Sequence, residues 1–129
     1  MGPACLEDLM LYAILCYNLE SVVGDWPREK AEAVMAHRRS IAEKLRSEGR
    51  FSAFAKLMPT TAATTLRAGR VPVVLDGPFA ETKEQLLGVH FVECASLEEA
   101  IEIASSLALQ TGALEIRPVQ ASFNLETTQ

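Results

Sequence analysis

The segment Asp76-Gly77-Pro78-Phe79-Ala80-Glu81-Thr82-Lys83-Glu84-Gln85-Leu86-Leu87-Gly88 connects two runs rich in β-forming residues, Val71–Leu75 and Val89–Cys94. Its first three residues predict a turn, because aspartate can bond nearby backbone N–H groups, glycine tolerates positive φ and proline fixes its own φ. Four ionisable side chains lie within residues 76–84: Asp76, Glu81, Lys83 and Glu84. So much charge between two apolar strands indicates either a solvated connection or a functional site.

The chain before this segment is predicted to supply a strand, a helix and a second strand. A continuous apolar run at Met10–Tyr17 is typical of a buried strand, and residues 18–25 form a loop. A helix begins near Pro27 and ends before Gly49, because proline is favoured at the first helical position and glycine just beyond the last. Phe51–Met58 is predicted to be the second strand.

A hairpin, a second helix and a last strand complete the pattern. The hairpin, Ala63–Arg67 with Val71–Leu75, is expected at a sheet edge or on an arm, because Pro72 cannot donate to a ladder. A capping box begins the second helix at Ser96, and the last strand is Ala113–Val119. The apolar face of that helix is predicted to consist of Leu97, Ala100, Ile101, Ala104 and Leu107. Two βαβ halves joined through a hairpin arm predict an α+β, ferredoxin-like split βαβ fold.

The overall composition fits one small globular domain. The 129 residues are 49% apolar and carry a net charge of −5, which argues against a nucleic-acid partner. No apolar run reaches the roughly 18 residues that a membrane span needs, and the first residues do not form a signal peptide. We expect a flexible leader at 1–8, one domain at 9–120 and a C-terminal tail at 121–129.

The cysteines and histidines give no sign of a metal site. Cys5, Cys16 and Cys94 are odd in number and widely spaced, which is typical of reduced thiols in a cytoplasmic protein. Neither a Cys-x-x-Cys nor a His-x-x-x-His spacing occurs, and no glycine-rich phosphate loop is present. We therefore expect no metal ion and no cofactor.

The Asp76–Gly88 segment also resembles the signature of the YCII-related proteins, in the branch named for its Asp-Gly-Pro-Phe motif. Upstream, Thr64-Thr65-Leu66-Arg67 is similar to the branch's Thr-Thr-x-Arg segment. Downstream, Gly112–Val119 is similar to its closing Glu-x-Arg-Pro strand, and His37 lies in the first helix where the family usually has a histidine. The resemblance implies a ferredoxin-like fold that pairs into a dimeric α+β barrel.

One departure from the wider family concerns catalysis. The resemblance implies an aspartate in an Asp-Pro-like segment after the second helix, but residues 105–112 here contain neither aspartate nor proline. If a His–Asp pair is the machinery of the wider family, the carboxylate must come from elsewhere, or this protein lacks the activity.

The candidate catalytic pair is His37 with Asp76, because a carboxylate orients a histidine ring and raises its basicity. His37 is predicted at the edge of the first helix's apolar stripe, close to the turn segment. Arg38 falls inside that stripe, where it either binds an anion or lays its aliphatic stem on the core. The other candidate ligand-binding residues are Glu81, Lys83, Glu84 and Arg117.

Each of these residues also has a purely structural interpretation. Asp76 before Gly-Pro is good turn chemistry without any ligand, and Lys83 between two glutamates is typical of a solvated charge run. His37 can be an ordinary histidine on a helix surface. The second histidine, His90, shares a strand face with Val92 and Cys94 and is predicted to be a hydrogen-bonded histidine within the sheet.

Three functions remain open on the sequence alone. The first is an enzyme that uses His37 and a carboxylate on a small polar or anionic molecule. The second is a non-catalytic binding or regulatory module, since members of the Asp-Gly-Pro-Phe branch are sometimes found beside sigma factors. The third is a structural dimer. A homodimer is expected in every case, because one sheet face would otherwise stay bare; apolar side chains on the strands include Phe51, Phe54, Leu57, Met58 and Val92.

Overall fold

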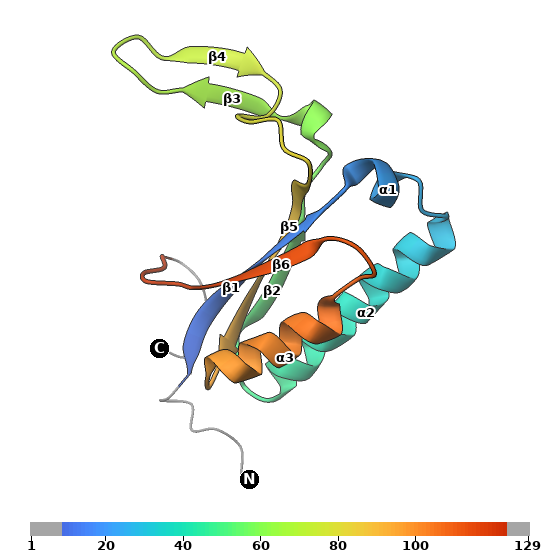
Figure 1. Cartoon of the computed structure of the whole chain (residues 1–129). Coiled ribbons are helices and arrows are strands. Elements are labelled where there is room, and N and C mark those ends of the chain that lie inside the picture. Colours follow the sequence, from blue (N-terminus) through green and yellow to red (C-terminus); the bar gives the residue numbers. More distant parts are fainter. Residues whose placement is uncertain (1–8, 124–129) are drawn as a thin grey trace.

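The computed structural model describes residues 9–123 and has a ferredoxin-like α+β arrangement (Figure 1). Four antiparallel strands form the main sheet in the order β2–β5–β1–β6. Their bounds are Ser52–Lys56 for β2, Gln85–Cys94 for β5, Met10–Asn18 for β1 and Ala113–Pro118 for β6. The expected leader at 1–8 and the tail end at 124–129 lie outside the described residues.

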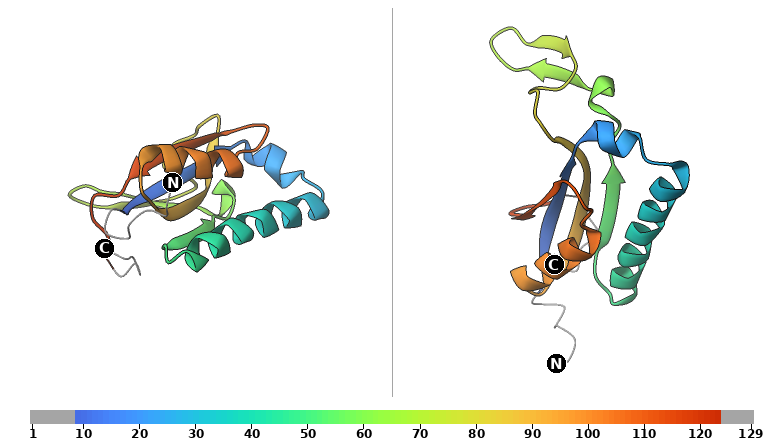
Figure 2. Two further views of the ribbon diagram at one scale, coloured as in Figure 1. Left: turned by 90° about the horizontal axis from the view of Figure 1, so that it is seen from below. Right: turned by 45° about the vertical axis from the view of Figure 1, so that its right-hand side comes forward.

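Two helices, α2 (Arg28–Ser47) and α3 (Leu97–Leu107), cover the same face of this sheet (Figure 2). The α3 helix begins as the sequence predicts, since the Ser96 side chain accepts a hydrogen bond from the Glu99 backbone N–H. None of the helices in residues 9–123 combines the length and apolar character needed to cross a bilayer.

The core lies between these helices and the sheet. Strand register places Tyr12 opposite Val92, and Ile14 opposite both His90 and Ile116, so these side chains share the helix-covered face. They pack with side chains from both helices and the sheet into one buried cluster: Tyr12, Ile14, Leu45, Val92, Cys94, Ala100, Ala104 and Leu107.

Within residues 9–123, the opposite face of the sheet carries no helix (Figure 2). Ala13 pairs with Phe91 and Leu15 pairs with Val89, and all four side chains are half-buried. The bare face expected from the sequence is therefore present in the single chain, and the strands do not close into a barrel within the described residues. Of the apolar strand residues named from the sequence, Phe54 and Val92 face the helices, because Phe54 pairs with His90 and Val92 pairs with Tyr12.

Several boundaries differ from the sequence prediction. The strand expected at Val89–Cys94 begins at Gln85, because Gln85 and Leu86 pair with the end of β1 beyond a register shift at Cys16/Tyr17. The loop expected at 18–25 contains a short helix, α1 (Glu20–Gly24). Strand β2 is shorter than the predicted Phe51–Met58. On α3, Leu97 and Ile101 are not buried: 48% and 47% of their surface is exposed.

The hairpin forms an arm, as Pro72 predicts. Strands β3 (Thr64–Arg67) and β4 (Val73–Asp76) pair only with each other and project away from the main sheet, as Figure 1 shows. Gly77 closes the base of the arm with a φ of 95°, and its N–H donates to the Ala63 carbonyl at 2.8 Å. The Thr65 hydroxyl donates to the Gly77 carbonyl at 2.7 Å. The positive φ explains why glycine occupies this turn.

Candidate functional site

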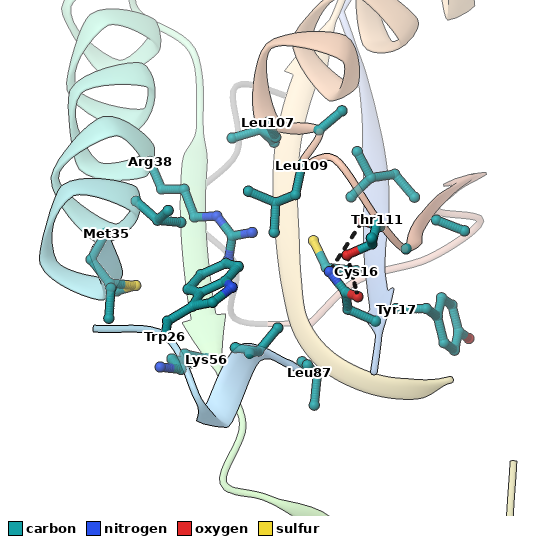
Figure 3. A pocket seen from close by; sticks show the side chains of 18 residues that line it. Cys16, Tyr17, Trp26, Met35, Arg38, Lys56, Leu87, Leu107, Leu109 and Thr111 are labelled. Atoms are coloured by element: carbon teal, nitrogen blue, oxygen red, sulfur yellow. Dashed lines mark hydrogen bonds between the residues drawn. The ribbon is translucent and has the colours of Figure 1, made fainter. Parts of the chain in front are cut away.

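A cavity of about 110 Å³ lies between α2, the sheet, the α1 segment and the connection from α3 to β6 (Figure 3). Most of its lining is apolar, with Trp26 and Met35 on one side and Leu109 on the other. Its lining contains two cations, Arg38 and Lys56, and no carboxylate among the described residues. The remaining lining residues are Cys16, Tyr17, Asn18, Val23, Ala31, Val34, Leu87, Leu107, Ala108, Thr111, Gly112, Ala113 and Leu114.

A pair of hydrogen bonds fixes the wall formed by the α3–β6 connection. The Asn18 side-chain amide donates to the Thr111 carbonyl at 3.1 Å, and the Thr111 hydroxyl donates to the Asn18 side-chain oxygen at 3.0 Å (Figure 3). Asn18 is itself buried at the end of β1. The end of a central strand thus holds in place a loop that lies 93 positions later in the sequence.

Arg38 extends from α2 into this cavity (Figure 3). Its guanidinium carbon lies 5.0 Å from the centre of the Phe54 ring, a cation–π geometry. Its Nε atom is buried and has no hydrogen-bond partner in the described part of the chain. Burial lowers the pKa of Arg38 from its ordinary value, and the neighbouring Cys16 opposes that change. A desolvated guanidinium with an unused donor is a ready site for an anion.

His90 lies on the strand beneath Arg38. Its ring centre is 4.1 Å from that of Phe54, and only 1% of its surface is exposed. Burial, and after it the charge of Arg38, lowers the pKa of His90 to about 4. The sequence predicts a hydrogen-bonded sheet histidine, but Nε2 has no partner among residues 9–123. The correction has a physical reason: the neighbours of His90 across the strands are Ile14 and Phe54, whose side chains carry no hydrogen-bonding group.

Cys16 supplies the one thiol among the described residues of the lining. Burial raises its pKa above the ordinary value, and the charge of Arg38 opposes this only in part. The thiol is therefore protonated at neutral pH, and the thiolate that nucleophilic catalysis needs is disfavoured.

The predicted site residues fall into four separate places. Arg38 lines the cavity. His37 is exposed on α2, where its Nε2 is 2.7 Å from the Ser106 carbonyl at the end of α3. Arg117 forms an ion pair with Glu115 on the sheet face opposite the helices.

The turn segment lies at the arm, away from His37. Asp76 ends β4, and Glu81, Lys83 and Glu84 follow in the connection from the arm back to β5. None of these residues, and neither His37 nor Arg117, lines the cavity. Within one chain the structure does not bring His37 and Asp76 into a common pocket.

Sequence reasoning missed most of the cavity wall. Only Trp26 could have been noticed from the sequence, since it is the only tryptophan of the chain and directly precedes Pro27, the residue before α2. Nothing in the neighbouring sequence indicates that Asn18 pairs with Thr111 or that Lys56 lines the cavity. No group of residues suited to hold a metal ion occurs among those that the structure describes.

Comparison with known proteins finds similarity along most of the chain. Residues 10–122 match the model of a domain described as YCII-related. An uncharacterised protein of Rhizobium meliloti (strain 1021) is 50% identical over 115 residues, which cover 85% of this chain and 92% of that protein.

Proposed function

This chain belongs to the YCII-related family, and from its cavity we propose that it binds a small molecule with an apolar body and one anionic group, without catalysing a reaction on it. One observation carries the proposal: the half-buried Arg38 guanidinium enters an apolar cavity, and no carboxylate of the described residues pairs with it. An anion at Arg38 would pair with a guanidinium charge that no carboxylate of the described residues neutralises.

The size and lining of the cavity define the body of the ligand. An engineered cavity of about 150 Å³ is known to hold benzene, so a cavity of about 110 Å³ suits a single small ring or a short aliphatic chain. The Trp26 ring and the side chains of Val34, Met35 and Leu109 would cover that body, and burial of apolar surface stabilises the complex by about 25 cal/mol per Å².

The lining supports binding rather than catalysis. It contains no histidine and no carboxylate among the described residues, and burial keeps its thiol protonated. The acid/base alternative, with His37 and Asp76 as the catalytic pair and Glu81, Lys83, Glu84 and Arg117 at the ligand, would require the arm of a second copy to approach α2. No observation in the single chain favours that arrangement over the cavity.

The remaining assignments are also proposals. We assign the chain to the Asp-Gly-Pro-Phe branch on the residues from Asp76 to Phe79, and a regulatory role beside a sigma factor would use the cavity as a sensor. We place the protein in the cytoplasm because Cys16 and Cys94 are free thiols in its core.

Benzoate is the probe that tests the cavity. We expect the protein to bind benzoate at least about tenfold more tightly than benzyl alcohol, because only benzoate offers a carboxylate to Arg38. Arg38→Leu should reduce benzoate affinity by about tenfold or more and leave benzyl alcohol affinity nearly unchanged. Both affinities are measured by NMR titration, which also locates the ligand through shifts at Trp26 and Met35.

Arg39→Leu is the matched control, since Arg39 is the next residue on α2 and is exposed. It removes the same charge without touching the cavity lining, so benzoate affinity should stay within about twofold. Equal effects of the two substitutions would show that benzoate responds to net charge alone. Equal affinities for benzoate and benzyl alcohol would contradict an anion site at Arg38.

We also propose that two copies pair through the bare sheet face. Phe91→Glu places a charge among the half-buried side chains of Leu15 and Val89 and should convert a dimer into a monomer in sedimentation experiments at about 10 µM. Val22→Glu, on the exposed surface of α1, should leave the dimer intact. A dimer that survives Phe91→Glu unchanged would exclude this face as the interface.

A further inference from the structure

The arm formed by β3 and β4 exposes apolar side chains on both of its faces. Leu66 and Val74 pair on one face, and their exposed fractions are 65% and 66%. Val73 and Leu75 lie on the other face and are exposed by 49% and 47%, while Val71 near the tip reaches 78%. This concentration of exposed apolar surface on a segment without neighbours indicates a contact surface.

The arm has few contacts with the rest of its chain; one of them places the Arg67 guanidinium 5.3 Å from the centre of the Phe79 ring. Among the described residues its strands pair only with each other, and an isolated two-stranded hairpin is at best marginally stable in water. An ordered arm therefore gains stability when another surface covers it.

The charge of the arm is opposite to that of the rest of the chain. The arm, residues 64–76, contains two arginines, Arg67 and Arg70, and one carboxylate, Asp76 at its base. Since the whole chain has a net charge of −5, the remaining residues sum to −6 (−5 minus +1). A cationic, apolar arm on an acidic molecule favours an acidic, apolar receptor.

Helix α3 presents a surface of that kind. Leu97 and Ile101 are spaced one helical turn apart and are about half exposed. Glu98 and Glu102 are exposed beside them with the same spacing. An apolar stripe next to an acidic stripe on the outer surface of a helix complements the arm in both chemistry and charge.

The arm cannot reach this surface of its own chain. Strand β5 separates them: the arm precedes Gln85 and α3 follows Cys94, so they lie at opposite ends of the sheet (Figure 1). Ten residues of strand span roughly 33 Å. A two-fold axis that sets β5 of two copies antiparallel would bring the arm of each copy to the start of α3 in the other.

We propose that the β3–β4 arm of one copy docks on the α3 surface of a second copy, defined by Leu97, Glu98, Ile101 and Glu102. The contact is reciprocal in a two-fold dimer, with each copy giving its arm and receiving the arm of the other. Arg67 and Arg70 face the two glutamates, and the apolar side chains of the arm cover Leu97 and Ile101.

Charge reversal in mixed dimers tests the contact. One variant carries Arg67→Glu and Arg70→Glu, and the other carries Glu98→Arg and Glu102→Arg. Dimers of either variant with itself place like charges in both contacts, whereas the mixed dimer has opposite charges in both. Native mass spectrometry of the equimolar mixture should show about tenfold or more mixed dimer than the two self-dimers together, whereas random pairing would give equal amounts.

A second charge reversal provides the control. A variant with Arg39→Glu and Lys44→Glu changes the same number of charges on the exposed surface of α2. Mixed with the Glu98→Arg, Glu102→Arg variant, it leaves like charges in one of the two contacts, so the mixed dimer should not exceed its random share. A random distribution of the arm and α3 variants, or an unmutated chain that is monomeric at 100 µM or so, would overturn the proposal. The readout is selectivity among dimers, so it is independent of benzoate binding and of the Phe91→Glu result.

Discussion

Replacing Gly112 by alanine is expected to lower the free energy of unfolding by about 4 kcal/mol, which is enough to unfold a marginally stable domain. Gly112 has a φ of 93°, a conformation that disfavours any side chain. A Cβ atom there would also lie 2.3 Å from the Tyr17 carbonyl oxygen and 2.9 Å from Cγ of Asn18. Relief of that overlap must move the end of β1, and with it the Asn18–Thr111 hydrogen bonds that shape the cavity.

Gly77→Ala separates backbone strain from steric overlap. Gly77 has nearly the same φ, 95°, but a Cβ atom there would meet nothing within 4 Å. We therefore expect a loss of only about 1–2 kcal/mol for this variant. Urea denaturation of the two variants gives the comparison directly. Similar losses would mean that the contacts of Gly112 with Tyr17 and Asn18 relax at little cost.

Acidification should destabilise the protein through His90. The pKa of His90 is about 4 in the folded state and near 6.5 in the unfolded chain, because burial and Arg38 disfavour the protonated ring. Between these values the unfolded state binds more protons, so stability is complete above about pH 6.5 and is lost as the pH falls toward 4. Between pH 7 and pH 5 the expected loss is about 2 kcal/mol.

His90→Leu should abolish most of this pH dependence, since leucine has a similar volume and does not titrate. The free energy of unfolding, measured in urea at pH 7 and pH 5, should then differ by less than about 0.5 kcal/mol in the variant. His37→Leu serves as the control, because His37 is exposed and the acid-induced loss should persist without it. A His90 variant that keeps the full acid-induced loss would place the titrating group elsewhere.

Most of the fold could be predicted from local chemistry. Three features depend only on residues that are close together in the sequence, so they could be predicted directly. They are the turn at Asp76–Pro78, the arm implied by Pro72 and the helix cap at Ser96. The start of β5 at Gln85 could not be read in the same way. Its first residues pair with the end of β1 through a register shift, which depends on a strand far away in the chain.

The candidate site was harder to predict than the fold. Arg38 stood out because a charged residue falls inside an apolar helical stripe, and it does enter the cavity. Asp76 was expected beside His37 because the turn segment leads back to the sheet, but the hairpin holds Asp76 at the base of a projecting arm. The cavity wall held by Asn18 and Thr111 depends on two residues that lie 93 positions apart in the sequence. No pattern of sequence spacing predicts that they meet.

The position of β1 has a consequence for synthesis on the ribosome. This strand is the first of the described chain, yet it lies in the middle of the sheet and pairs only with β5 and β6. Gln85 is the first residue of its partner strands to be synthesised. It pairs with Asn18, which is added long before it. Both edges of an apolar strand therefore stay uncovered while more than half of the chain is made, and the sheet can form only after the segment with β5 has emerged. During that interval β1 is the segment most exposed to aggregation and the one that a chaperone would protect first.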